Sequence, residues 1–241
     1  MMIRSKAIWF SLLLLASYCV PSAVSQQVQL LLEDPGSNTM NGVYVGPYTF
    51  QEQTLPNGNT QQAGLICDDF SDEVGPGDSW KANVTSFSNL NSATGLMFEG
   101  KSNWQQGYVA MAYLATQMMG TTNSTTIGYL AYEIWAVFEP TAVTNWLNSH
   151  GGSNIVSMIM TGAANALAYV QANNLTAANF SGWEILTPAS YPGCQQNQSC
   201  PQEYLQYVPE GGTALVYLLL ALGSCFGVMF MRSRRQVSVL Q

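Results

Sequence analysis

The hydrophobic pattern of this chain changes its period once, and that change limits the folds open to it. Between residues 27 and 87, short runs rich in β-branched and aromatic residues alternate with Gly, Pro and Asn turn signals. The runs cover residues 28–33, 42–51, 63–70 and 79–87. Strands this short and this closely spaced predict an antiparallel sheet or a small barrel.

After a polar stretch, apolar residues recur every three to four positions, which is the period of an amphipathic helix. The first predicted helix ends at Gly120, the second ends before Pro140, the third covers residues 141–149, and the fourth covers about 154–172. Residues 180–190 then predict a returning strand. The expected fold class is therefore α+β: a strand-rich first part, a helical middle and a closing strand.

The apolar stripes of these helices are interpreted as buried faces rather than as a cofactor site. The stripe of the first helix runs from Tyr108 to Met119, and that of the second includes Ile134 and Trp135. The fourth helix places Met158 on the face that is expected to point inward.

The N-terminal segment has the order of parts of a secretory signal peptide. Arg4 and Lys6 precede an apolar run over residues 7–16, and small residues stand at Ala23 and Ser25. The apolar run is short for a membrane-spanning helix. We expect residues 1–25 to be a signal peptide that is cleaved before Gln26.

The C-terminal segment is long enough to cross a membrane. Residues 212–231 are twenty positions without a charge, followed by Arg232, Arg234 and Arg235. Because basic residues stay on the cytoplasmic side, the body is expected outside the cytoplasm and residues 232–241 inside. Residues 26–207 remain as one exported domain.

Once the terminal segments are set aside, the body is strongly acidic. Between Gln26 and Glu210 only Lys81 and Lys101 face all fourteen acidic residues of the chain, a net charge of −12. Such a surface repels DNA, RNA and anionic lipid headgroups, so nucleic-acid binding is excluded.

Three cysteines belong to the body. Cys194 and Cys200 stand six positions apart in a polar loop, and outside the cytoplasm they are expected to form a disulfide. Cys67 is left over at the end of an apolar run; it is either a buried free thiol or a reactive one.

The sequence shows no catalytic constellation. His150 is the one histidine, which argues against a Ser-His-Asp triad and a His-based metal site, and no cofactor motif is present. An acidic stretch could collect oxygens for Ca²⁺, but without EF-hand spacing, so a solvated acidic loop is the simpler interpretation and no metal site is assigned. Its members are Asp68, Asp69, Asp72, Glu73 and Asp78. A glycan-active enzyme with paired carboxylates stays open, although no pair is indicated.

The C-terminal segment resembles the PEP-CTERM sorting signal of exported proteins in Gram-negative bacteria that make extracellular polysaccharide. The resemblance covers residues 208–236 and combines a Val-Pro-Glu motif, an apolar helix and an arginine cluster. The motif residues are Val208, Pro209, Glu210, Gly211 and Gly212, with Gly211 where the usual motif has a second proline. The resemblance implies that an exosortase recognises the motif and removes or transfers the tail.

The body also resembles, more weakly, the thioester domains of bacterial surface adhesins. In that family a cysteine at the end of an early strand is linked to a glutamine four residues before a tryptophan. Here Cys67 and Trp135 match, but Ala131 stands at the glutamine position, so the resemblance implies the fold without that cross-link. A thioester with another glutamine, such as Gln117, is the remaining alternative.

These observations predict a non-enzymatic envelope or extracellular-matrix protein, delivered by the general secretion machinery and sorted by an exosortase. Its expected role is structural or adhesive in a polysaccharide-rich layer. The alternatives are a thioester adhesin that uses Cys67 and a glycan-active enzyme.

Overall fold

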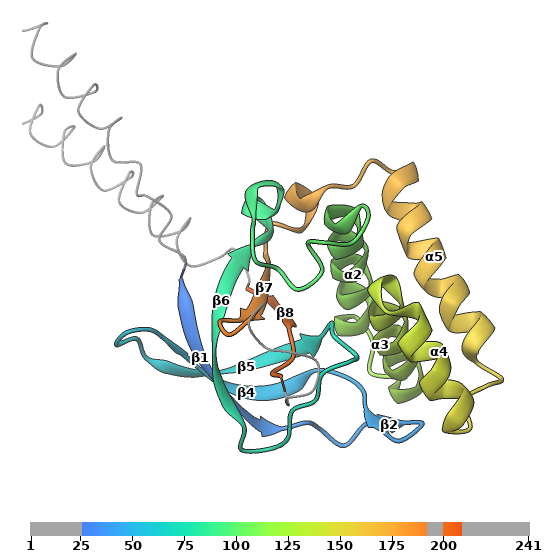
Figure 1. Cartoon of the computed structure of the whole chain (residues 1–241), viewed down its shortest axis with the longest axis horizontal. Coiled ribbons are helices and arrows are strands. Elements are labelled where there is room, and N and C mark those ends of the chain that lie inside the picture. Colours follow the sequence, from blue (N-terminus) through green and yellow to red (C-terminus); the bar gives the residue numbers. More distant parts are fainter. Residues whose placement is uncertain (1–25, 192–199, 209–241) are drawn as a thin grey trace, which may run out of the picture.

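A computed structural model of the protein describes residues 26–191 and 200–208. Within these ranges, an antiparallel β-barrel lies beside a group of α-helices (Figure 1). The predicted α+β class is thereby confirmed, and of the two predicted arrangements of the strands the barrel is the correct one.

The barrel has six strands, each antiparallel to both of its neighbours. In order around the barrel they are β1 (Gln27–Asp34), β4 (Tyr48–Thr54), β5 (Thr60–Cys67), β8 (Tyr204–Tyr207), β7 (Trp183–Pro188) and β6 (Ser79–Ser86). The returning strand β7 was predicted from the sequence. β8, which closes the barrel between β5 and β7, was not predicted.

The strands form because alternate side chains can be buried inside the barrel. In β1, Val28, Leu30 and Leu32 are buried. Three aromatic rings fill the interior: Phe50 contacts Tyr204 with ring centres 4.9 Å apart and Trp80 with ring centres 5.7 Å apart. Burial of these rings and aliphatic chains is the main stabilising contribution to the barrel.

One predicted strand, residues 42–51, is wrong as a single element. It consists of β3 (Val43–Tyr44), which pairs with β2 (Thr39–Met40) in a separate hairpin, and of β4. Between them Gly46 has a φ of 134°, a conformation that L-residues rarely adopt, and Pro47 has no N–H to donate. The hairpin instead contacts the helices, where the Tyr132 hydroxyl donates to the Met40 carbonyl at 3.0 Å.

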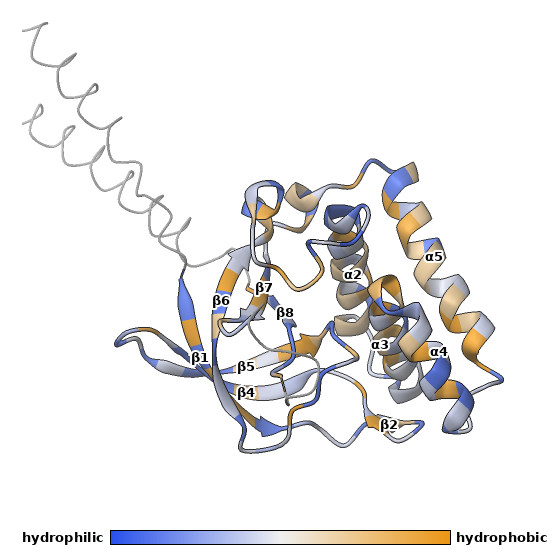
Figure 2. Ribbon diagram, in the orientation of Figure 1, coloured by the Kyte–Doolittle hydropathy of each residue, from blue (hydrophilic) through white to orange (hydrophobic). Residues whose placement is uncertain are grey.

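The helical part comprises α2 (Trp104–Met119), α3 (Ser124–Phe138), α4 (Pro140–Ser149) and α5 (Val156–Ala172), with short 3₁₀ turns η1 (Phe87–Ser92) and η2 (Ala177–Phe180). α2, α3 and α5 pack against one another, and each contributes buried hydrophobic residues to the core. Figure 2 shows hydrophobic and hydrophilic residues alternating along α5. Gly107 permits a close approach of α2 and α3, because a Cβ there would lie 2.2 Å from Cζ of Phe138.

Three details of the predicted helices are wrong. Met119 and Met158 are 54% and 42% exposed rather than buried. Each lies in a terminal turn of its helix, and a 3.6-residue pattern does not reveal how far the neighbouring helix extends. The third predicted helix also begins one residue earlier, with Pro140 at its first position, where the missing N–H removes no helical hydrogen bond.

Among the described residues no helix is long and apolar enough to cross a membrane. The predicted signal peptide and the predicted span over 212–231 lie outside the described residues.

Candidate functional site

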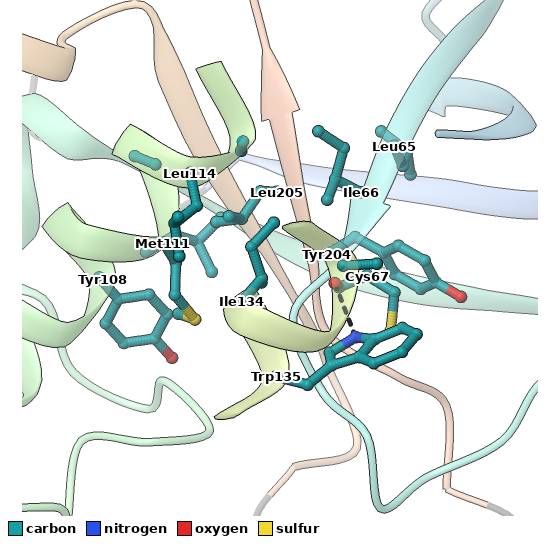
Figure 3. Packing of buried hydrophobic residues seen from close by; sticks show 14 of the residues in the cluster. Leu65, Ile66, Cys67, Tyr108, Met111, Leu114, Ile134, Trp135, Tyr204 and Leu205 are labelled. Atoms are coloured by element: carbon teal, nitrogen blue, oxygen red, sulfur yellow. Dashed lines mark hydrogen bonds between the residues drawn. The ribbon is translucent and has the colours of Figure 1, made fainter. Parts of the chain in front are cut away.

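The segment that follows β5, residues 68–73, begins the connection to β6 and contacts the helices at Trp135 and Glu139; we term it the acidic loop. The Asp68 N–H donates to the Glu203 carbonyl, beside β8, at 3.3 Å. The indole N–H of Trp135 on α3 donates to the Cys67 carbonyl at 3.0 Å (Figure 3). The start of the loop is therefore held by both halves of the fold.

Glu139, at the junction of α3 and α4, fixes the middle of the acidic loop. One carboxylate oxygen accepts from the Phe70 N–H at 2.6 Å, and the other accepts from the Ser71 hydroxyl. Hydrogen bonds to a charged carboxylate are among the stronger ones in proteins. The position of the loop thus depends on where the two helices meet.

Asp69 is the most unusual residue of the acidic loop. Its side chain is 1% exposed; Oδ1 accepts from the backbone N–H groups of Ser71 at 3.0 Å and Asp72 at 3.4 Å. Oδ2 has no hydrogen-bond partner within the described ranges. Burial, followed by the negative charges of Glu139 and Asp72, raises the pKa of Asp69 to about 9, so this carboxyl holds a proton at neutral pH.

Behind the acidic loop, Glu203 is the centre of a buried polar network. It is completely buried and accepts hydrogen bonds from the hydroxyls of Tyr108 (2.5 Å) and Thr187, and from the Met97 N–H at 3.2 Å. Asp68 is also completely buried, and burial together with the charge of Glu203 raises its pKa well above the usual range. Neither carboxyl oxygen of Asp68 has a hydrogen-bond partner among the described residues, so burial favours its neutral, protonated form.

An open cleft of about 300 Å³ lies on one side of the acidic loop, between the β2–β3 hairpin and helices α3 and α4; we term it the aromatic cleft. Its aromatic lining residues are Tyr44, Tyr48, Phe70, Trp135 and Trp146. Its polar lining residues are Asp69, Asp72, Glu73 and Gln202. The lining combines flat apolar faces with carboxylate and amide groups, as ligand sites generally do.

The rings of the aromatic cleft are held in place by contacts behind them. The ring centre of Phe70 lies 5.1 Å from that of Trp135 and 6.0 Å from that of Trp146. Trp146 donates through its indole N–H to the Asn41 carbonyl at 2.9 Å, and it stacks on His150 with ring centres 3.6 Å apart. The cleft is therefore largely preformed.

A second pocket, of about 240 Å³, lies on the other side of the acidic loop. It is lined by Asp69, Ser71, Asp72, Met97, Phe98, Lys101, Glu139, Tyr191 and Cys200. Asp69 and Asp72 line both cavities, so the acidic loop forms the wall between them.

Cys67 lies at the predicted strand end, in contact with α3. Its thiol is 1% exposed and donates to the Asp69 carbonyl at 2.9 Å. Burial and the neighbouring carboxylates raise its pKa, which favours the thiol over the nucleophilic thiolate. Ala131 is buried on α3, whereas Gln117 is exposed on α2. These positions agree with a buried structural thiol.

Cys200 is buried, and Cys194 lies outside the described residues, so their disulfide stays a prediction. The same holds for the sorting motif from Pro209 to Gly212 and for Arg232, Arg234 and Arg235; Val208, which is described, donates its N–H to the Gly182 carbonyl at 2.8 Å.

Of the five acidic residues that the sequence grouped together, Asp78 lies apart from the site, where it accepts from the Gly75 N–H at 2.7 Å. Across residues 26–191 and 200–208, no group of three or more His, Cys, Asp or Glu side chains is arranged to hold a metal ion.

Comparisons with protein-family models, with curated proteins and with solved structures find no match to this chain. The function therefore has to be argued from the site itself. Sequence reasoning found Asp69 and Asp72 but missed Glu139, Glu203 and the aromatic cleft. Phe70, the single aromatic residue among the four acidic residues of the acidic loop, was the one local signal of the cleft.

Proposed function

We propose that this protein is exported from a Gram-negative cell and acts, without catalysis, as an adhesive or structural protein that binds polysaccharide in the envelope or extracellular matrix. The signal-peptide pattern of residues 1–25 supports export, and the PEP-CTERM-like segment 208–236 supports sorting at the envelope. The general secretion machinery and an exosortase would be its processing partners.

The aromatic cleft is the observation that supports a saccharide ligand. Sugar rings have apolar C–H faces, which pack on aromatic rings, and hydroxyl edges, which need hydrogen-bond partners. The cleft offers both: Tyr44 and Trp146 on its walls, and Asp72, Glu73 and Gln202 among them. Tyr44 is 48% exposed, so a large ring surface is accessible before any ligand binds.

The test is binding of a panel of bacterial polysaccharide fragments to the full-length protein in detergent. We expect Tyr44→Ala and Trp146→Ala to weaken binding, by at least about tenfold for a stacked ring. Tyr169→Ala is the matched control, because Tyr169 is 46% exposed on α5, outside the cleft. Binding that is equally strong in Tyr44→Ala and Tyr169→Ala would exclude the cleft as the site.

The sorting proposal has its own test, the mass of the mature protein from the membrane and from the medium. If an exosortase processes the chain, the released form lacks the residues beyond the Val208–Gly212 motif. A released form that retains Arg232, Arg234 and Arg235 would contradict it.

A second candidate is a glycan-active enzyme, and the state of Asp69 is the observation that favours it. A protonated Asp69 stands beside the carboxyls of Asp72 and Glu139, between two cavities. An acid and a carboxylate in one site are the elements of glycosidic bond cleavage. Release of reducing ends from a bound polysaccharide, abolished in Asp69→Asn, would establish this function; binding without any release would leave the adhesive one.

A further inference from the structure

The charge of the aromatic cleft indicates which kind of saccharide it takes. Asp69, Asp72 and Glu73 line the cleft, and no lining residue is basic. The basic residues of the described ranges are Lys81, Lys101 and His150. Lys101 lines the second pocket instead, and His150 stacks on the Trp146 ring without being a lining residue of the cleft. An anionic sugar would therefore meet carboxylates without a compensating cation.

A buried carboxyl oxygen without a hydrogen-bond partner belongs to Asp69, a residue that lines the cleft as well as the second pocket. Oδ2 of Asp69 belongs to a side chain that is 1% exposed, and no N–H or O–H of the described residues donates to it. A buried polar atom without a partner is unfavourable and is often completed by a ligand. A ligand that brings hydrogen-bond donors and positive charge would offset the repulsion among the carboxyls and favour loss of the Asp69 proton, after which Oδ2 can accept a hydrogen bond from the ligand.

The aromatic rings of the cleft favour the same kind of group. A cation near the face of an indole or phenol ring is attracted by the negative π-surface of the ring, most strongly where water is excluded. Tyr44 and Trp146 provide such rings in the same cleft that Asp72 and Glu73 line, and His150 covers one face of the Trp146 ring. Carboxylates and aromatic faces around one cleft are the environment that an ammonium group prefers.

On the basis of the proposed saccharide-binding function, we propose that the aromatic cleft selects an amino sugar with a free, protonated amine. The ammonium would lie between the Asp72–Glu73 side and the Trp146 ring, and the sugar ring would pack on Tyr44. A metal cation is not the occupant we infer, since no metal-binding arrangement is found among the described residues.

The test compares two probes that differ in one group: a β-1,4-linked glucosamine oligosaccharide and its fully N-acetylated counterpart, titrated into the full-length protein at a mildly acidic pH that protonates the amines. We expect the free-amine form to bind at least about tenfold more tightly, equal to about 1.4 kcal/mol. This preference should fall as salt is added, because an exposed carboxylate such as Glu73 is screened.

Variants distinguish the contribution of the carboxylates to binding from that of the aromatic rings. Asp72→Asn and Glu73→Gln should remove most of the preference while N-acetylated binding persists, and Tyr44→Ala should weaken both forms. Glu33→Gln makes the same change of charge at an exposed residue of β1, outside the cleft, and should leave the preference unchanged.

Each other outcome has a definite meaning. Equal affinity for both probes, unchanged by Asp72→Asn, would overturn the amine selectivity and leave saccharide binding intact. Absence of binding for both probes and for the wider polysaccharide panel would remove the proposed function itself. Competition by spermidine as effective as that of the glucosamine oligomer would show that the cleft takes an amine without its sugar, and it would overturn the choice of ligand.

Discussion

Replacing Asp69 by asparagine should make the protein more stable at neutral pH, although it removes a buried, hydrogen-bonded side chain. The folded state keeps Asp69 protonated up to a pKa of about 9, whereas the ordinary value is 3.8. Between these values the unfolded chain releases a proton that the folded chain retains. A carboxyl with a raised folded pKa contributes its full stability below pH 3.8, and this contribution is lost as the pH rises toward 9.

The magnitude follows from the linkage between proton binding and folding. Each pH unit above the ordinary pKa lowers the free energy of unfolding by about 1.4 kcal/mol, which amounts to about 4 kcal/mol at pH 7. Asn cannot ionise, and its amide oxygen can accept from the Ser71 N–H as Oδ1 of Asp69 does. That amide is a weaker donor than a carboxylic acid, by about 1 kcal/mol, so the expected net gain at pH 7 is about 3 kcal/mol.

The assay is urea unfolding of the full-length protein, followed by tryptophan fluorescence at an acidic and at a mildly alkaline pH. Asp69→Asn should be less stable than the wild type by about 1 kcal/mol at about pH 4, where the ionisation advantage is absent, and the variant should be the more stable at about pH 8. The wild type should also lose stability over this range through other buried carboxyls, such as Glu133, whose pKa burial raises to about 7. Glu33→Gln serves as the exposed control. A variant that is less stable than the wild type at alkaline pH, or equally shifted at both pH values, would refute the reasoning.

The remaining predictions concern packing and Cys67. Tyr108→Phe should lower the free energy of unfolding by about 1–3 kcal/mol, because Glu203 loses a buried donor at 2.5 Å; urea unfolding measures the loss, and an unchanged midpoint would contradict the network. Gly107→Ala should destabilise by about 1–3 kcal/mol despite a better helix propensity, because the new Cβ meets the Phe138 ring, which stacks on Phe98; thermal unfolding that is unchanged or raised would contradict this contact. The intact mass of the protein should show no loss of ammonia, and methylamine should add no mass, because Ala131 provides no side-chain amide for the Cys67 thiol to attack; a mass lower by one ammonia, to which methylamine adds its own mass while freeing the Cys67 thiol, would establish a thioester.

A gain in stability from Asp69→Asn would bear on function as well. Residues that destabilise the fold in which they lie are expected at ligand sites, where activity rather than stability retains them. The acidic loop holds such a residue against two cavities. The same variant should weaken binding of the free-amine saccharide if Asp69 completes the ammonium site.

The elements that the sequence predicted correctly are those determined by local spacing. Three of the four strand runs, the four helices and the helix ends at Gly120 and before Pro140 follow from periods of two and 3.6 and from Gly and Pro, whose effects act within a few residues. The terminal signals, predicted from apolar length and charge order, lie outside the described residues and stay predictions. Asp69 and Asp72 stood out as part of an acidic run, without any indication of what surrounds them.

The features that only the tertiary structure determined depend on contacts between segments that are distant in the sequence. β8 has four residues and becomes a strand because β5 and β7 leave a gap in the barrel that its backbone fills. Glu203 becomes a buried acceptor because Tyr108 and Thr187 converge on it from distant positions in the chain. The aromatic cleft exists because the β2–β3 hairpin, the acidic loop and α4 come together. A local sequence pattern cannot predict contacts between side chains that are about a hundred residues apart. The raised pKa of Asp69 has the same origin, since burial and the charge of Glu139 are properties of the assembled fold and not of the neighbouring sequence.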